Sequence, residues 1–114
     1  MFDVQDFPAS LGVLWALPSV TPTQSAVVVR AIQYGSLCAL AVDGGATVSA
    51  GHIALDVTFT PRAGADCPSI SNGEGRALQY TATIAAPSGT YEVTVVHHNG
   101  VTSDTLVDRR VTVP

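Results

Sequence analysis

The stretch His-Ile-Ala-Leu-Asp-Val-Thr-Phe-Thr, residues 52–60, decides the fold class of this protein. Apolar side chains alternate there with small or polar ones, at Ile53, Leu55, Val57 and Phe59. Successive side chains of a β-strand point to opposite faces of the sheet, whereas a helix repeats every 3.6 residues. The alternation therefore predicts a strand with one buried face and one face in water.

The same period of two recurs further along the chain. It is carried by three later stretches, residues 77–84, 90–96 and 107–113. Shorter strands are expected at residues 11–16 and at residues 46–50, the second of which is bounded by glycines. Residues 26–34 contain three successive valines, which predicts a central strand covered on both faces. About seven strands result.

Turn-forming residues separate these strands at regular intervals. The strongest hairpin signal is Asn99-Gly100, because both residues accept positive φ. No window of about 11 residues keeps its apolar side chains at helical spacing. Short strands without intervening helices favour an all-β, antiparallel β-sandwich over a parallel α/β sheet, with a small closed barrel as the alternative.

The 114 residues fit a single domain, which we assign to residues 11–114. We expect residues 1–10 to form a mobile N-terminal segment. The loop at residues 63–76 is rich in glycine and small polar residues, and we expect it to be mobile as well.

The composition excludes several classes of protein. With 46% hydrophobic and 12% charged residues, the chain is too apolar to be disordered. It has no lysine, and its five arginines face nine acidic residues, so it offers no basic surface to nucleic acid or anionic lipid. No apolar run approaches the roughly 18 residues that span a bilayer. We therefore expect neither nucleic acid as a partner nor membrane insertion.

The compartment is predicted from the N-terminus and from two cysteines. The first residues carry acids where a signal peptide carries positive charge, so either the protein stays inside the cell or a leader has been removed. Cys38 and Cys67 form no CxxC motif and have no neighbouring histidine, which favours one long-range disulfide in an exported domain over a zinc or redox site. The alternative is two buried free thiols in a cytosolic or virion protein.

The residues Pro-Ser-Gly-Thr-Tyr-Glu-Val at 87–93 resemble the turn and penultimate strand of many immunoglobulin-like (Ig-like) domains. The resemblance implies that Tyr91 is a tyrosine-corner residue, whose ring packs inward while its hydroxyl bonds a nearby backbone group. Over residues 25–114 the chain is similar to small secreted bacterial Ig-like β-sandwich domains of unassigned role. Antibody-like recognition is not implied, because Trp15 precedes both cysteines and Cys67 falls in a loop.

Three histidines are the candidates for metal binding or general base chemistry. His97 and His98 are adjacent, so on a strand they point to opposite faces and cannot both bind one ion. One of them could join His52 and an acid such as Asp56 or Asp104 to make a three-ligand zinc site. No spacing in the sequence demands this. We expect solvated histidines at strand ends, with no metal and no cofactor.

Nucleophilic catalysis would need a serine beside a histidine that a carboxylate orients. The serines considered are Ser69, Ser71, Ser88 and Ser103, and none lies in a Gly-x-Ser-x-Gly elbow. Asp104 and Asp108 would lie about 13 Å apart on a strand, too far for the paired carboxylates of a glycosidase. We expect no catalytic residues.

The arginines raise a question of pairing. In the pair Arg109 and Arg110, one side chain must share a face with the apolar residues of its strand, and Arg30 lies inside a hydrophobic stretch. Either that side chain of the pair extends past the edge of the core into water, or it pairs with an acid such as Asp56 or Glu92, and we expect structural pairing more than ligand recognition.

The most apolar segment of the chain includes Leu14, Trp15 and Leu17. We expect it to pack as a first strand on the edge of the sandwich. A sharper hypothesis is that it docks into another subunit as an added strand, because a linker with prolines follows it.

No catalytic constellation emerges, so the sequence predicts a non-enzymatic structural or protein-interaction module of an exported bacterial protein, secreted, periplasmic or on the cell surface. The alternative is a self-assembling subunit of a surface filament or phage particle, because low charge suits extensive subunit burial. A third hypothesis, an enzyme using His52 with His97 or His98, predicts metal in the purified protein.

Overall fold

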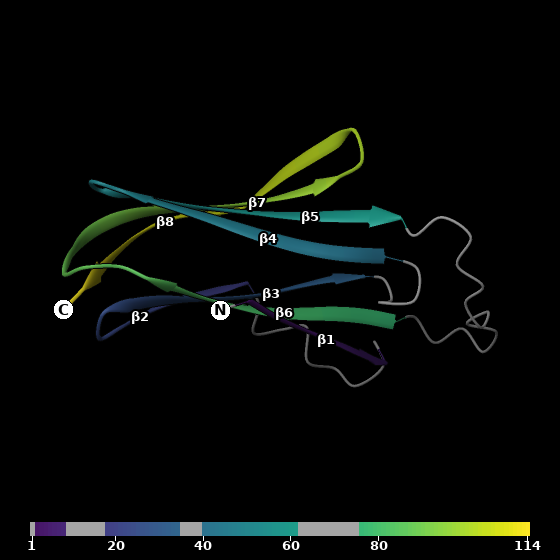
Figure 1. Cartoon of the computed structure of the whole chain (residues 1–114), viewed down its shortest axis with the longest axis horizontal. Coiled ribbons are helices and arrows are strands. Elements are labelled where there is room, and N and C mark those ends of the chain that lie inside the picture. The colour runs from purple at the N-terminus through teal and green to yellow at the C-terminus, as the bar shows by residue number, and fades with distance from the viewer. Residues whose placement is uncertain (1, 9–17, 35–39, 62–75) are drawn as a thin grey trace.

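The computed structural model describes residues 2–8, 18–34, 40–61 and 76–114 of the chain (Figure 1). These residues form eight strands, and no helix occurs among them. In chain order the strands are β1 (Phe2–Pro8), β2 (Ser19–Thr23), β3 (Ala26–Tyr34), β4 (Leu40–Ser49), β5 (His52–Pro61), β6 (Arg76–Ala85), β7 (Gly89–Asn99) and β8 (Thr102–Val113). The all-β prediction is confirmed, with eight strands in place of about seven.

The strands form two four-stranded sheets that lie as two layers (Figure 1). One sheet has the order β1-β6-β3-β2 and the other has the order β4-β5-β7-β8. All neighbouring strands are antiparallel except β5 and β7, which are parallel. The expectation of purely antiparallel pairing is wrong at that point. After β5 the chain crosses to the other layer, forms β6 there and returns as β7, and a crossover of this kind places neighbours in parallel.

The core lies between the two layers and follows the alternation seen in the sequence. All four alternating apolar residues of β5, from Ile53 to Phe59, are buried. The same holds for Leu78, Tyr80, Ala82 and Ile84 of β6, for Tyr91, Val93 and Val95 of β7, and for Val107, Val111 and Val113 of β8. The strands predicted at residues 52–60, 77–84, 90–96 and 107–113 are therefore confirmed.

Two predicted strands differ from the observed ones in detail. β3 has the predicted bounds and a central place in its sheet, but only one of its faces is fully covered: Val27 and Val29 have no exposed surface, whereas Arg30 is exposed. The strand predicted at residues 46–50 is part of β4, which begins at Leu40 and continues through Gly44 and Gly45. Glycine lowers strand propensity without forbidding a strand, so the pairing with β5 prevails.

β1 and β2 were not predicted. In β1, Phe2 and Val4 alternate with Asp3 and Gln5, a signal too short to stand out, and the strand pairs with β6. β2 contains Pro22, which a strand tolerates at the edge of a sheet. The strand expected at residues 11–16, the side chains of Leu14, Trp15 and Leu17, both cysteines and residues 63–75 of the predicted loop lie outside the described residues.

The hairpin expected at Asn99-Gly100 joins β7 to β8. Its ladder closes at Asn99 and Thr102, so the two turn residues are Gly100 and Val101, one position later than predicted. Gly100 has a φ of 64° while Val101 has no positive φ, which matches a turn with glycine at the first central position rather than a type I′ turn.

Candidate functional site

The three histidines, which were the candidates for chemistry, lie on one sheet in three different environments. His97 on β7 points into the core and is 1% exposed. Its Nε2 is 2.7 Å from the hydroxyl oxygen of Tyr80 on β6, so this hydrogen bond joins the two layers. Phe59 packs against the imidazole with a ring centroid distance of 5.0 Å. The expectation that all three histidines are solvated is therefore wrong for His97.

Burial controls the ionisation of this pair. Loss of solvation lowers the pKa of His97 to about 4, while the nearby Asp104 carboxylate opposes the shift and His98 adds slightly to it. Burial also raises the pKa of Tyr80 above its ordinary value. Both groups are neutral at pH 7, and the tyrosine hydroxyl can donate to the unprotonated Nε2.

His98 points to the opposite face and forms a hydrogen-bonded chain across three strands. Its Nε2 lies 2.8 Å from Oδ1 of Asp56 on β5, and its Nδ1 lies 2.8 Å from Oγ of Ser103 on β8. His52 makes a separate contact on this outer face, with Nε2 at 3.2 Å from the hydroxyl oxygen of Thr94. The parallel pairing of β5 with β7 brings Asp56 beside His98, and sequence alone contains no sign of that pairing.

The chain Asp56, His98 and Ser103 has the residue types of a nucleophilic triad. The side chains of His98 and Asp56 are 35% and 54% exposed, so the chain lies on an open sheet face. Acyl transfer also needs hydrogen-bond donors for the oxyanion and a concave site for the substrate. Neither of the two hollows described below is lined by any of these three residues.

The described residues contain no group of three or more His, Cys, Asp or Glu side chains placed to hold a metal ion. His97 is separated from His52 and His98 because adjacent strand residues face opposite ways. Nor do the described residues include a helix long and apolar enough to cross a membrane.

Tyr91 occupies the start of β7 and is 6% exposed. Its hydroxyl donates a hydrogen bond of 2.8 Å to the carbonyl oxygen of Pro87, four residues upstream. The ring faces the core and the hydroxyl bonds back to the backbone, as in a tyrosine corner.

The arginines do not form the ion pairs expected for them. Within the described ranges, Arg30, Arg109 and Arg110 are all exposed and none is in an ion pair, and Asp56 binds His98 instead. Arg109 lies between Val107 and Val111 on β8, an edge strand, so its side chain can leave the core face for water.

Two of the surface hollows border β1. A polar hollow of about 560 Å³ lies on the outer face of the first sheet and is lined by Asp3, Gln5, Arg30, Gln79 and Thr81 among others. An apolar one of about 320 Å³, the side groove, opens between the layers and is lined by Phe2, Gly44, Ala46, Val48, Leu55, Ala82, Thr83, Ile84 and Ala85.

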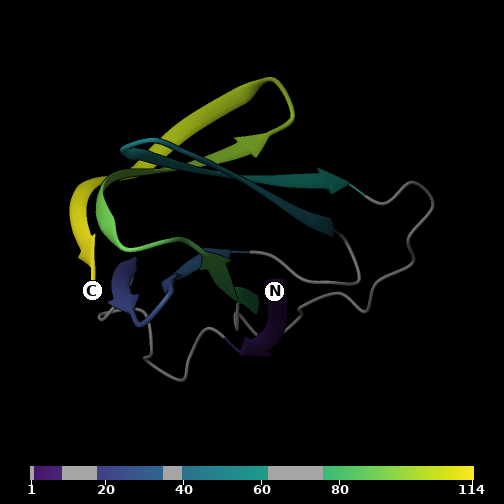
Figure 2. The same ribbon diagram turned by 60° about the vertical axis from the view of Figure 1, so that its left-hand side comes forward.

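The side groove lies on the open flank of the two layers. On the opposite flank, β2 and β8 contact each other, and Figure 2 shows the C-terminal end of β8 bending toward β2. On the groove flank, the Phe2 ring reaches across from β1 to Gly44 of β4 and stacks on Tyr80 at 5.3 Å. Beyond Gly44 the inner edge of β4 borders the groove.

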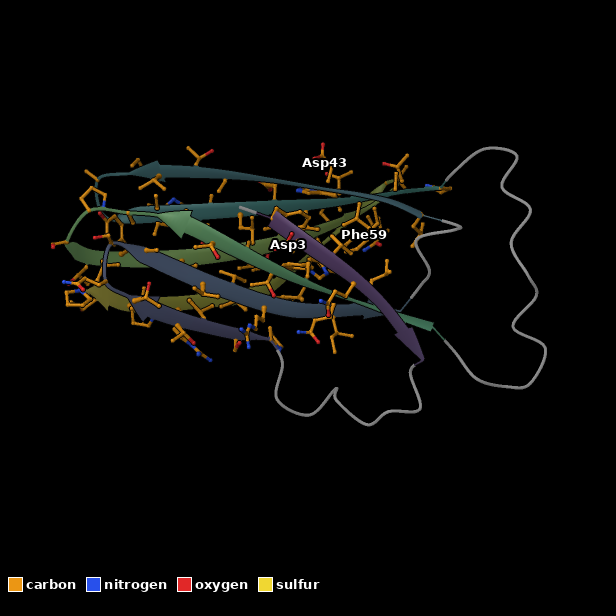
Figure 3. The ribbon with its side chains drawn as sticks, turned by 60° about the horizontal axis from the view of Figure 1, so that its bottom comes forward. Asp3, Asp43 and Phe59 are labelled. Atoms are coloured by element: carbon orange, nitrogen blue, oxygen red, sulfur yellow. The ribbon has the colours of Figure 1, made fainter. Side chains whose placement is uncertain are left out.

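β4 differs from the other three edge strands because it is long and contains few of the residues that prevent pairing with another chain. β1 contains Asp3, Asp6 and Pro8, β2 contains Pro22, and β8 contains four charged residues. In the ten residues of β4 the single charge is Asp43, which points away from the other layer (Figure 3). Residues 45–49 are all exposed, including Val48 at 37%. Charges and prolines are the usual means by which proteins stop an edge strand from pairing with another chain.

In the comparisons with known proteins, no family model, curated protein or solved structure matches the chain. The candidate site therefore rests on geometry, and we define it as the β4 edge, residues 44–49, together with the side groove.

Proposed function

We propose that this protein is a non-enzymatic protein-interaction module that binds an additional β-strand at the β4 edge. The observation that carries the proposal is the contrast among the four edge strands, of which β4 alone combines ten residues, one charge and no proline. An exposed edge offers main-chain donors and acceptors to an extended segment, and pockets beside it select alternate side chains. The side groove is such a pocket.

A synthetic peptide with the sequence of β4, residues 40–49, is a suitable strand probe. We expect it to shift the amide NMR signals of residues 44–49 in the intact protein. Val48→Lys should abolish these shifts, because Val48 faces the side groove and an inward-pointing charge on an edge strand blocks strand addition. Thr105→Lys, which adds the same charge at an exposed position of β8, is the matched control and should leave the shifts unchanged. Shifts confined to β1, β2 or β8, or none at all in the monomeric protein, would refute the proposal.

The non-enzymatic part of the proposal is tested at Ser103. If the chain Asp56, His98 and Ser103 activates the hydroxyl, a fluorophosphonate should label Ser103, and His98→Gln should prevent the labelling. We expect no labelling in either protein, because the chain lies on an open sheet face. Mass spectrometry of the intact protein distinguishes the two results, and stoichiometric labelling of Ser103 would reverse the assignment.

We further propose that the domain is an Ig-like sandwich variant belonging to an exported bacterial protein. The hydrogen bond from Tyr91 to Pro87 supports the Ig-like part. The parallel pairing of β5 with β7 departs from the antiparallel sheets of Ig domains. The exported part depends on a disulfide between Cys38 and Cys67, which is tested below.

A further inference from the structure

β4 has a sequence that is nearly symmetric about Gly45. Moving outward from it, Gly44 corresponds to Ala46 and Val42 to Val48. These four residues lie on the inner face of β4, because each pairs with a buried residue of β5; Val42 pairs with Phe59 and Val48 pairs with Ile53. An antiparallel copy of β4 centred on Gly45 would therefore match small residues with small ones and valine with valine, each on the same face.

Among the described residues, nothing requires glycine at position 45. A Cβ built there would meet no atom within 4 Å, and Gly45 has no positive φ. Gly44 next to it is explained, because a Cβ there would lie 2.6 Å from the Phe2 ring. A glycine in a strand interior weakens the strand and often marks the close approach of another backbone. Gly45 is thus an independent observation that points to an occupant at the centre of this edge.

We infer that the occupant of the β4 edge is β4 of a second copy of this chain, paired antiparallel with Gly45 facing Gly45 of the second copy. The inference rests on the proposed function, because it names the partner of the same site. The twofold arrangement joins two four-stranded sheets into one of eight strands. It places Val48 beside Val42 of the second copy, at the border of the side groove.

The charge pattern fits this register. Asp43 faces Thr47 of the second copy, so the two Asp43 carboxylates are not opposite each other. Pairing centred two residues earlier would place the two acids directly opposite, which is unfavourable. The register therefore makes a prediction at Thr47 that no other register of β4 makes.

The test is sedimentation velocity on the intact protein over a range of concentrations, which separates the 11.7 kDa monomer from a dimer of twice that mass. Thr47→Lys places two lysines opposite the two Asp43 carboxylates and should lower the dimer dissociation constant about fivefold. Thr47→Glu should raise it by a similar factor. Both effects should shrink in high salt, since the pairs are exposed.

Gly45→Lys is the second variant, and it places two lysines face to face on the twofold axis. It should raise the dimer dissociation constant several-fold, and it should leave the monomer folded because the space around position 45 is open. Thr105→Lys on β8 is the matched control and should dimerise like the unmodified protein. Circular dichroism and thermal unfolding verify the fold of each variant.

Other outcomes overturn the inference. If Gly45→Lys leaves the dimer dissociation constant unchanged and Trp15→Ser abolishes self-association, the contact belongs to the apolar segment near the N-terminus. A protein that stays monomeric at every concentration but binds the residue 40–49 peptide refutes the second copy and leaves the proposed function standing. A protein that stays monomeric and does not bind the peptide refutes both the second copy and the proposed function.

Discussion

His97 is the single polar side chain buried among the described core residues. It remains there because its Nε2 is paired with Tyr80, and a buried polar group without a partner would cost free energy. The described residues contain no buried side-chain nitrogen or oxygen left without a hydrogen bond. The hydrogen bond between His97 and Tyr80 therefore joins the two layers, and it offsets the free-energy cost of removing both polar groups from water.

This burial predicts that acid weakens the fold. The pKa of His97 falls to about 4 in the folded protein, whereas an unfolded histidine titrates near 6.5, so between these values the unfolded chain binds a proton that the folded one does not. The free energy of unfolding contributed by His97 should fall by about 2 kcal/mol between pH 7 and pH 5. Urea unfolding at several pH values measures the effect.

His97→Gln removes the titrating group while an amide can still bond Tyr80, so its stability should be lower overall but nearly independent of pH over this range. His52→Gln, on the exposed face, is the control and should keep the slope of the unmodified protein. Equal slopes for His97→Gln and the unmodified protein would contradict this account.

Tyr91 provides a second prediction at this scale. Tyr91→Phe removes the hydroxyl that donates to Pro87 and should lower the free energy of unfolding by about 1 kcal/mol, the usual net contribution of one hydrogen bond. Thermal or urea unfolding measures the change. An unchanged free energy of unfolding would mean that water bonds the hydroxyl as well as Pro87 does, and it would contradict the tyrosine-corner role.

Among the strands, β1 and β4 meet where the Phe2 ring approaches Gly44, and this contact links the two layers. The Phe2 ring occupies the space where a Cβ of residue 44 would lie, and it also stacks on Tyr80. β4 therefore needs glycine at this position for a packing reason, although its φ is ordinary for any residue.

Gly44→Ala should consequently destabilise the protein by about 1 kcal/mol or more, because the Phe2 ring must move. Gly45→Ala is the matched control in the neighbouring position and should be neutral or slightly stabilising. Urea unfolding compares the two. Combining Gly44→Ala with Phe2→Ala should remove most of the additional penalty of the alanine, and independent effects of the two changes would disprove the contact.

In the whole molecule, as far as its described residues show, the two layers are closed on one flank and open on the other. β2 and β8 contact each other on the closed flank, and the side groove borders the exposed β4 edge on the open one. The proposed second copy covers the open flank and leaves the closed one in water. This asymmetry is why the proposal assigns association to β4 and not to β8.

The cysteines provide the prediction at this scale. A disulfide between Cys38 and Cys67 would close a loop of about 30 residues and stabilise the fold by about 3.5 kcal/mol on the chain-entropy model. We expect no reactive thiol when the protein is denatured without reductant, and a lower unfolding temperature after reduction. Two reactive thiols per chain would remove the argument for export.

Much of the fold could be predicted because a strand with one dry face needs apolar side chains at every second position. That requirement is local, so β5, β6, β7 and β8 were all recognised from their alternating residues. β1 and β2 were missed because their patterns are short, and β4 was predicted too short because glycine normally ends a strand. The positions of the polar side chains do not follow from this alternation, so the burial of His97 and the lack of ion pairs to described residues at Arg109 and Arg110 were not predicted.

The amino-acid sequence alone established the all-β class, most strand positions and the buried face of β5, β6, β7 and β8, because these depend on side chains two residues apart. Three relations became visible in the folded protein alone: β5 and β7 lie parallel, His97 contacts Tyr80 across the core, and His98 joins Asp56 to Ser103. It also established that β4 is an edge strand of its sheet. These relations join residues far apart in the chain, and their geometry depends on which strands become neighbours, a choice set by the packing of the whole core.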